Sequence, residues 1–313
     1  MQHPIRHLHH VTATVAEAGP DLTFCRELLG LRLVKRTVNF DNHNVYHFYY
    51  GTEQGAPGTI WTTFPYAGWK VPGGVQGAGQ IVATSFSVPA DSLDAWRARL
   101  SAAGLTADQG GERFGASWLS VRDPSGLVLE LVADARDRRA PWPGGGVDRA
   151  AALRGLHGVT LLLRERAATV ALMTGLLGFA VVDEGPDRTR LAVGDDQPGH
   201  LVDLVVSADA PPARNGLGTV HHVAFAIGSA EEQLRLRAEL VQLGYDVTPV
   251  RDRTYFQSIY FREPGGVLFE VATMSPGFTY DEPLDRLGTG LKLPPWEEPN
   301  RSAIEAALPP LGP

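Results

Sequence analysis

An internal repeat limits the folds open to this chain. The segments HHVTATVAEAGPDLTFCRELLGLRLV, from His9, and HGVTLLLRERAATVALMTGLLGFAVV, from His157, align without a gap at an offset of 148 residues. DPSGLVLELVAD, from Asp123, matches EPGGVLFEVATM, from Glu263, in the same way. Such self-similarity indicates one supersecondary unit that recurs along the chain and packs against its own copies.

The repeat defines four modules, and each reads as a strand, a helix and then further strands. In the second module Leu93, Trp96 and Leu100 lie on one helical face, and Gly104 is placed as a C-terminal cap. The fourth module repeats this arrangement, and its helix stops at Gly244. The approximate limits of the modules are 5–66, 79–134, 154–208 and 218–275.

We therefore predict an α+β fold in which four βαβββ modules are arranged as two paired-module halves. A sheet covered by a helix on one face must bury its other face against a second unit, so paired modules enclose a trough. The first two modules form an N-terminal half, 1–134, and the last two a C-terminal half, 154–275. Residues 135–153 are the expected linker, and a Pro-rich tail occupies 276–313.

This fourfold βαβββ organisation resembles the vicinal oxygen chelate superfamily, which contains extradiol dioxygenases, glyoxalase I and bleomycin-resistance proteins. The resemblance covers residues 5–275. It implies a metal or ligand site inside a trough, so the side chains that face the troughs are the candidates for function.

Two pairs of adjacent histidines begin two of the predicted strands, in RHLHHVTATV and TVHHVAFAI. Because side chains alternate across a strand, one member of each pair faces the trough and the other faces away. The apolar rows expected to pack against the helices leave His10, His222 and, in a later strand, Glu270 on the trough side. These rows are Val11, Ala13 and Val15; Val223, Phe225 and Ile227; and Val267, Phe269 and Val271.

Two neutral imidazoles and one carboxylate on the same side of a metal form the facial triad of non-haem Fe(II) oxygenases. We therefore expect His10, His222 and Glu270 to bind one ion, with Fe(II) the first choice, although Mn(II) also fits. The other interpretation of each histidine is a core residue satisfied by backbone groups. The coincidence of three ligands favours the metal.

The repeat supplies an internal control on this interpretation. The positions equivalent to the three ligands hold Gly158, Ala83 and Glu130. A structural role should recur in every copy, whereas a metal site need appear only once. We interpret Glu130 as a leftover carboxylate in a trough that has lost both imidazoles.

The ligand pattern also distinguishes among members of the superfamily. Glyoxalase-type members add a fourth carboxylate ligand, whose position here is about Thr62, with no acid beside it. Two-domain catechol-cleaving enzymes take all three ligands from the C-terminal half, which would require histidine at Gly158. Ligands from the first and fourth modules instead resemble the hydroquinone-type ring-cleaving dioxygenases, and the tail from Leu291 resembles the end of that family.

Five further residues are candidates for the chemistry. A hairpin near Gly265 would set Tyr260 opposite Glu270, where a phenol can hydrogen-bond a substrate oxygen; the alternative is an ordinary strand aromatic. The resemblance implies an active-site role for Arg253, otherwise a loop charge, and for His9 and His221, although strand alternation points both histidines away from the metal. Thr12 shares the face of His10 and is a plausible supporting hydroxyl.

We expect surface or capping roles for His43, His47, His157 and His200, and a small buried hydrophobe at Cys25.

Composition narrows the partners to small molecules. The net charge of −7 is spread along the chain, which argues against nucleic acid, and no apolar run is long enough for a membrane helix. One cysteine and the absence of a signal pattern favour a reducing cytoplasm. We expect an aromatic substrate and O2, with a homodimer implied by the resemblance. The alternatives are a metal-dependent glyoxalase-type lyase or isomerase, and a non-catalytic module that binds an aromatic or antibiotic-like ligand.

Overall fold

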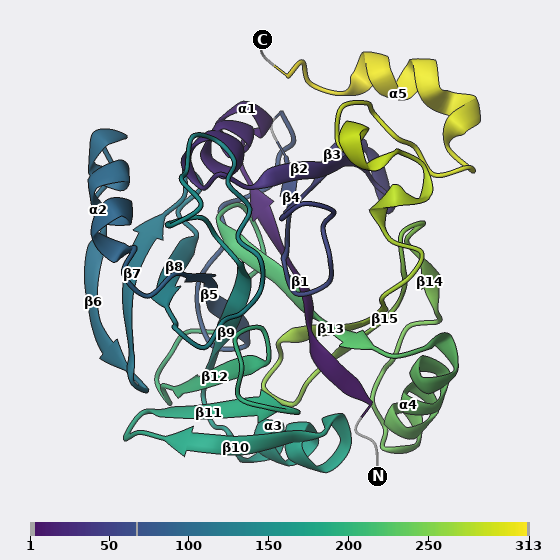
Figure 1. The fold of residues 1–313 in the computed structure, drawn as a ribbon. Helices are drawn as coiled ribbons and strands as arrows, with labels where there is room; N and C mark the ends of the chain where they lie inside the picture. The colour runs from purple at the N-terminus through teal and green to yellow at the C-terminus, as the bar shows by residue number, and fades with distance from the viewer. Residues whose placement is uncertain (1–3, 67, 312–313) are drawn as a thin grey trace.

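The computed structural model describes residues 4–66 and 68–311, and it contains four consecutive βαβββ modules (Figure 1). The first comprises β1 (Ile5–Val15), α1 (Ala18–Leu22) with a π-helical turn (Thr23–Leu28), β2 (Arg32–Asn39), β3 (Asn42–Gly51) and β4 (Ile60–Pro65). The second comprises β5 (Gln80–Val88), α2 (Leu93–Ala102), β6 (Asp108–Arg113), β7 (Ala116–Arg122) and β8 (Val128–Ala133). The predicted α+β class and its repeating unit are confirmed.

The last two modules repeat the pattern. The third comprises β9 (Gly155–Leu163), α3 (Ala167–Leu172) with a π-helical turn (Met173–Leu177), β10 (Phe179–Glu184), β11 (Arg188–Val193) and β12 (Leu201–Val206). The fourth comprises β13 (Thr219–Ile227), α4 (Ala230–Gln242), β14 (Arg251–Asp252), β15 (Gln257–Arg262) and β16 (Leu268–Thr273). Gly104 and Gly244 follow helices α2 and α4 with φ of 74° and 88°, as expected of C-terminal caps.

The sheets join modules that are not neighbours in the chain. One eight-stranded sheet has the order β14-β15-β16-β13-β1-β4-β3-β2, and the other has the order β10-β11-β12-β9-β5-β8-β7-β6. The first module therefore shares a sheet with the fourth, and the second with the third, which corrects the expectation that 1–134 and 154–275 each form a spatial half. The cause is the antiparallel pairing of β1 with β13 and of β5 with β9.

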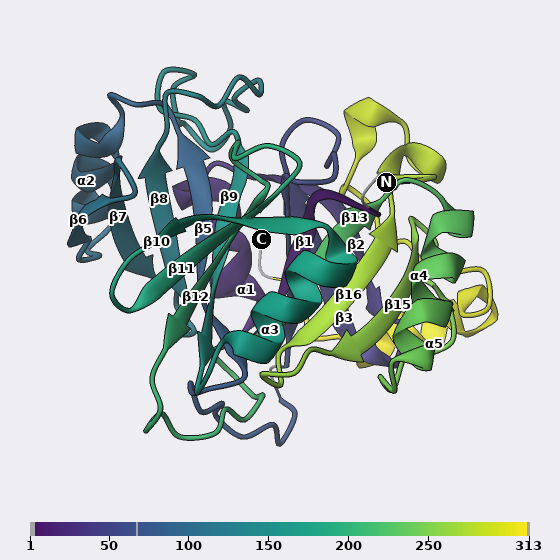
Figure 2. The ribbon, with the colours of Figure 1, turned by 90° about the horizontal axis from the view of Figure 1, so that it is seen from below.

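The core lies between the convex faces of the two curled sheets and under the helices (Figure 2). The ring of Trp61 in β4 meets Phe86 in β5 at 6.2 Å between centroids, and Phe179 meets Phe225 at 5.5 Å. All three predicted apolar rows belong to one buried cluster, and so does Cys25. Because these rows point inward, the opposite row of each strand faces the concave trough.

The C-terminal tail crosses the first sheet and ends in a short helix, α5 (Arg301–Ala307), above β2 and β3 (Figure 1). Three short 3-10 turns precede this helix, at Phe278–Tyr280, Leu284–Arg286 and Glu298–Asn300. The ammonium group of Lys35 in β2, which has no exposed surface, pairs with both Asp281 and Glu282 and thereby anchors the tail. No helix of the described residues has the length and apolar character needed to cross a membrane.

Candidate metal and substrate site

His10, His222 and Glu270 converge in the trough of the first sheet. Nε2 of His10 lies 3.3 Å from Nε2 of His222, and Oε2 of Glu270 lies 2.8 Å from His222 Nε2 and 3.4 Å from His10 Nε2. Neighbouring ligands of an octahedral ion with bonds of about 2.1–2.2 Å stand roughly 3 Å apart. Within the described chain, these three residues make the one group whose ligand atoms are close enough to hold a metal.

The register of three central strands produces this convergence. β1 runs antiparallel to β13 with His10 opposite Ala224, and β13 runs parallel to β16 with Ala224 beside Glu270. Each ligand lies on the face opposite the apolar row of its strand. All three are buried, so a cation held there would have little contact with solvent.

His9 sets the orientation of the His10 ring. Nε2 of His9 lies 3.2 Å from the carbonyl oxygen of Thr273, an acceptor only, so this nitrogen carries the hydrogen. Nδ1 of His9 then accepts from Nδ1 of His10 at 2.9 Å, which leaves Nε2 of His10 with a lone pair directed at the other two ligands. This tautomer, assigned from the hydrogen-bond network, is the one that a metal ligand requires.

His221 contacts His222 in the same way, with the two Nδ1 atoms 2.7 Å apart. Burial lowers the pKa of His221 to about 3, with His222 adding to the effect, so the ring is neutral at physiological pH. Strand alternation pointed His9 and His221 away from the metal, but the β1–β13 ladder shifts register at both residues, between Leu8 and His10 and again between Thr12 and Ala13, where His221 is the unpaired residue of β13. His9 contacts His10, and His221 lines the cavity described below.

Glu270 is ionised and lacks a full set of donors. Burial alone would raise its pKa, but the attraction of His10 and His222 holds that pKa well below its ordinary value. Ser258 donates a short hydrogen bond to Oε1, whereas Oε2 is buried and receives no hydrogen bond from the described residues. A buried carboxylate oxygen that faces an imidazole lone pair is strongly unfavourable unless a cation lies between them. The residues therefore fit a divalent metal.

A cavity of about 210 Å³ opens directly above the three ligands. Aromatic side chains form most of its wall, as expected of a site for a small ring. Polar groups lie among them at the rim. The remaining lining residues are Asn39, Phe40, Asp41, His47, Tyr49, Phe64, Tyr66, His221, Arg253, Phe256 and Tyr260.

Tyr260 and Arg253 occupy one side of this cavity. Tyr260 pairs with Glu270 across β15 and β16, which is the register expected from the sequence. Nε of Arg253 donates to the Tyr260 hydroxyl at 3.0 Å, and its Nη2 pairs with Asp41 of the first module at 3.1 Å. Burial raises the pKa of the Tyr260 phenol, and the negative charge of Glu270 adds to the shift, so Tyr260 remains a hydrogen-bond donor.

Thr12 lies at the end of a hydrogen-bond relay that begins at His47. Nε2 of His47 donates to Oγ1 of Thr62 at 2.9 Å, and that hydroxyl donates to Oγ1 of Thr12 at 2.8 Å. The expectation of a surface or capping role for His47 was wrong, because its ring is buried and lines the cavity. The same expectation was wrong for His157, which is buried beside Asp134 at 3.4 Å.

Thr62 occupies the position where a fourth carboxylate ligand would stand. Thr62 pairs with Thr12, two residues after His10, just as Glu270 pairs with Ala224, two residues after His222. The two sides of the trough are therefore equivalent in register but not in chemistry. A threonine hydroxyl engaged with Thr12 replaces the carboxylate.

Among the residues that the structure describes, the second trough holds no comparable ligand set. Glu130 accepts from Ser85 at 2.5 Å and pairs with Arg113 at 2.9 Å, so its charge is already compensated. Gly158 and Ala83 stand where His10 and His222 stand in the first trough, and both offer no side-chain ligand. This arrangement agrees with the interpretation of Glu130 as a leftover carboxylate.

The fold defines the class, a protein of paired βαβββ modules with a candidate metal site in one trough. Residues 155–271 match the model of the Glyoxalase/Bleomycin resistance protein/Dioxygenase superfamily. The chain is 41% identical to MhqO of Bacillus subtilis (strain 168), provisionally named a ring-cleaving dioxygenase, over 96% of this chain and 95% of MhqO. It is 36% identical to the chlorohydroquinone/hydroquinone 1,2-dioxygenase of Sphingobium indicum, over 92% and 91% of the two chains.

Comparison with solved structures leads to the same fold. A crystal structure of a provisionally named dioxygenase from Bacillus subtilis subsp. subtilis str. 168 matches with a TM-score of 0.94 at 39% identity, covering 100% of this chain and 99% of the other. Glyoxalase I from Zea mays has a TM-score of 0.64 at 15% identity, over 86% and 92% of the two chains, and shares the fold. The chain belongs to the ring-cleaving dioxygenases of the glyoxalase/bleomycin resistance protein/dioxygenase superfamily.

Proposed function

We propose that this protein is an Fe(II)-dependent, extradiol-type dioxygenase that opens the ring of a hydroquinone-like aromatic with O2. The observation that carries the proposal is the convergence of two imidazole Nε2 atoms and one ionised carboxylate oxygen beneath an aromatic-walled cavity. The 36% identity to an enzyme named for chlorohydroquinone and hydroquinone supports the substrate class. Mn(II) would fit the same ligands.

His10, His222 and Glu270 would hold the ion from one side, leaving the cavity side open. When bound, Fe(II) supplies a Lewis acid that acidifies a phenol and an electron donor for O2. In the overall reaction one O2 adds to the ring, one ring C–C bond breaks and both oxygen atoms stay in the product. No external reductant is consumed.

The protein's own groups orient the ring and handle its protons. A ring in a cavity of about 210 Å³ would contact Phe64, Tyr49 and Phe256, which exclude water. The Tyr260 hydroxyl, held by Arg253, is the donor placed to stabilise negative charge on a substrate oxygen. His221 is neutral and lines the cavity, so it is a candidate to hydrogen-bond a substrate oxygen.

Two alternative functions would require different sets of side chains in the trough. A glyoxalase-type isomerase would use a fourth carboxylate, and Thr62 stands in that position. A non-catalytic binding module would not need three convergent ligands.

We infer a cytoplasmic location, where a reducing medium would keep both Fe(II) and the free thiol of Cys25 reduced. The homodimer and the domain limits stay predictions.

Oxygen uptake by protein loaded anaerobically with Fe(II) tests the function. Substituted hydroquinones and catechols should give O2 consumption equimolar with a ring-opened chromophore, and hydroquinones should be the faster substrates. Zn(II)- or Ni(II)-dependent isomerisation of a hemithioacetal with no response to O2 would overturn the proposal. His222→Ala should abolish the uptake, whereas Glu130→Ala, in the second trough, should retain it.

A further inference from the structure

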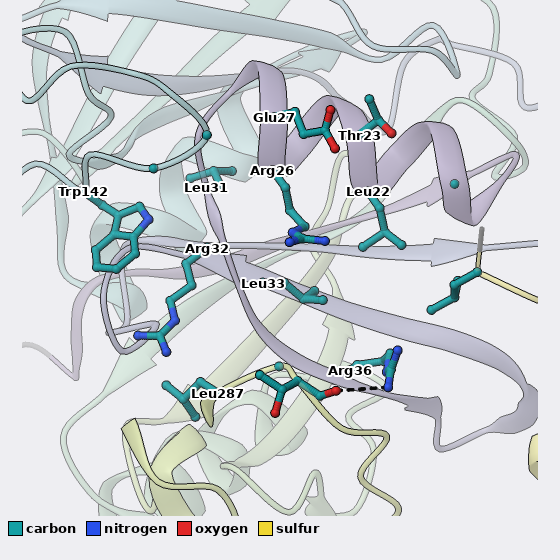
Figure 3. A pocket seen from close by; sticks show the side chains of 16 residues that line it. Leu22, Thr23, Arg26, Glu27, Leu31, Arg32, Leu33, Arg36, Trp142 and Leu287 are labelled. Carbon is teal, nitrogen blue, oxygen red and sulfur yellow. Dashed lines mark hydrogen bonds between the residues drawn. The ribbon is translucent and has the colours of Figure 1, made fainter. Parts of the chain in front are cut away.

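A second and larger pocket, lined in part by β2, lies apart from the cavity above the three ligands (Figure 3). It has a volume of about 650 Å³ and lies between the α1 helix with its π-helical turn, strand β2, the linker near Trp142 and the tail at Leu287–Thr289. None of its lining residues lines the cavity above the metal ligands. The pocket is therefore separate from the site of the proposed reaction.

Three guanidinium groups dominate the polar lining of this pocket, although the chain as a whole carries a net charge of −7. Arg26 comes from the helix, and Arg32 and Arg36 come from β2. Glu27 is the one carboxylate among the described lining residues, and Figure 3 shows it directed away from the guanidinium of Arg26. The lining thus has an excess of positive charge.

Hydrogen bonding within the described residues leaves much of this charge uncompensated. Arg32 donates to the backbone carbonyls of Glu53 and Leu284, and Arg36 donates to that of Thr289 at 3.3 Å. Nε of Arg36 is buried and has no partner, and no carboxylate within residues 4–66 and 68–311 forms an ion pair with any of the three arginines. A guanidinium has five N–H donors, so the pocket retains donors for an oxyanion.

The rest of the lining is apolar and suits a flat ring. The guanidinium of Arg32 lies 5.5 Å from the centre of the Trp142 ring, which gives the pocket a flat, polarisable wall. Leu31, Leu33 and Leu287 complete the apolar surface. A pocket that combines a ring-sized apolar wall with a cluster of arginines has the features needed to bind an anion on an aromatic body.

We propose that this pocket binds an aromatic carboxylate, with the carboxylate held by Arg26 and Arg36 and the ring placed against Trp142 and the leucines. The proposal is independent of the dioxygenase function, because neither the metal ligands nor the cavity above them takes part. Binding should weaken as ionic strength rises, since both arginines are at least partly exposed.

Calorimetric titration of the full chain with 2-naphthoate tests the proposal. Wild type should bind 2-naphthoate at least about tenfold more tightly than the neutral 2-naphthylmethanol. Arg26→Gln should weaken binding by roughly threefold to tenfold, and adding Arg36→Gln should weaken it by about thirtyfold or more. Arg97→Gln, an exposed arginine on α2 paired with Asp94, is the matched control and should change affinity less than twofold.

Three results would overturn the proposal: no binding by wild type, equal binding of acid and alcohol, or equal affinity in wild type and the arginine variants. Arg253→Gln separates the two pockets. Loss of binding in this variant alone would place the probe above the metal ligands. If the double variant does not fold, Arg26→Gln decides the matter, because the Arg26 side chain makes no hydrogen bond within the described residues that the substitution would break.

Discussion

The hydroxyl of Thr62 donates to that of Thr12 at 2.8 Å, at the position on β4 that corresponds to Glu270 on β16. At this position one side of the trough presents a carboxylate, and the other side presents a threonine hydroxyl bonded to a second threonine. With this difference the proposed cation site has three protein ligands and an open side, which is the requirement for binding substrate and O2 together.

Adding a carboxylate at this point should close the open side. In Thr62→Glu we expect the metal-free protein to be less stable than wild type, because an unpaired carboxylate would be buried, and bound Zn(II) or Ni(II) should raise its melting temperature more than that of wild type. Oxygen uptake with Fe(II) should fall by about tenfold or more. Thr62→Val is the neutral control, which should lack the metal-dependent stabilisation.

Tyr260 should serve turnover and not metal binding. Its hydroxyl contacts Arg253 and is absent from the ligand set, so Tyr260→Phe should keep its iron while kcat falls by roughly tenfold to a hundredfold. Tyr66→Phe, which removes another hydroxyl from the cavity wall, should change kcat by less than about threefold. Loss of iron from Tyr260→Phe would show that the phenol supports the metal.

Lys35 should contribute strongly to stability, because its buried ammonium group holds two carboxylates of the tail. Lys35→Met leaves Asp281 and Glu282 without their cation, and we expect the free energy of unfolding to fall by about 3–5 kcal/mol in denaturant titrations. Arg235→Met, which breaks an exposed pair with Glu231 on α4, should cost about 0.5 kcal/mol or less. Equal losses in the two variants would contradict the anchoring role of Lys35.

Asp21 should make stability depend on pH. Burial raises its pKa to about 7, although Thr63, Tyr50 and Cys25 donate hydrogen bonds that oppose the shift. Because the folded state holds this proton more tightly than the unfolded state, the associated stability is complete below pH 3.8 and is lost as the pH rises through 7. The difference is about 4 kcal/mol at most.

Asp21→Asn removes this titration. The stability of wild type relative to the variant should therefore decline between about pH 4 and pH 7.5, as measured by denaturant unfolding at each pH. A constant difference across this range would show that Asp21 does not titrate on folding. Asp94→Asn, at a carboxylate that is almost fully exposed, provides the control.

Local periodicity located the three side chains that converge in the trough. His10, His222 and Glu270 could be predicted because strands alternate with a period of two and each apolar row was unambiguous. His47 could not be recognised in this way. Val45, His47 and Tyr49 form one row of β3 and Tyr46, Phe48 and Tyr50 form the other, so both rows look suited to a core. The one feature of the sequence that could have indicated a buried role for His47 is a histidine within a strand whose two faces are both apolar or aromatic.

The pairing of strands that are far apart in the chain was the second feature that the sequence did not predict. The pairing of β1 with β13 joins residues more than two hundred positions apart, and no local pattern specifies which modules share a sheet. Alternation also fails where the ladder shifts register, as it does just before His10. At that shift His9 contacts His10, although His9 is not among the described residues that line the cavity.

The most direct test of the central claim is the number of Fe(II) ions bound per chain, measured by anaerobic equilibrium dialysis with metal analysis. We expect one Fe(II) per chain in wild type and in Glu130→Ala, and less than about a tenth of that in Glu270→Ala, because only the first trough brings two imidazoles to a free carboxylate oxygen. Undiminished iron in Glu270→Ala, or equal losses in Glu270→Ala and Glu130→Ala, would contradict the account.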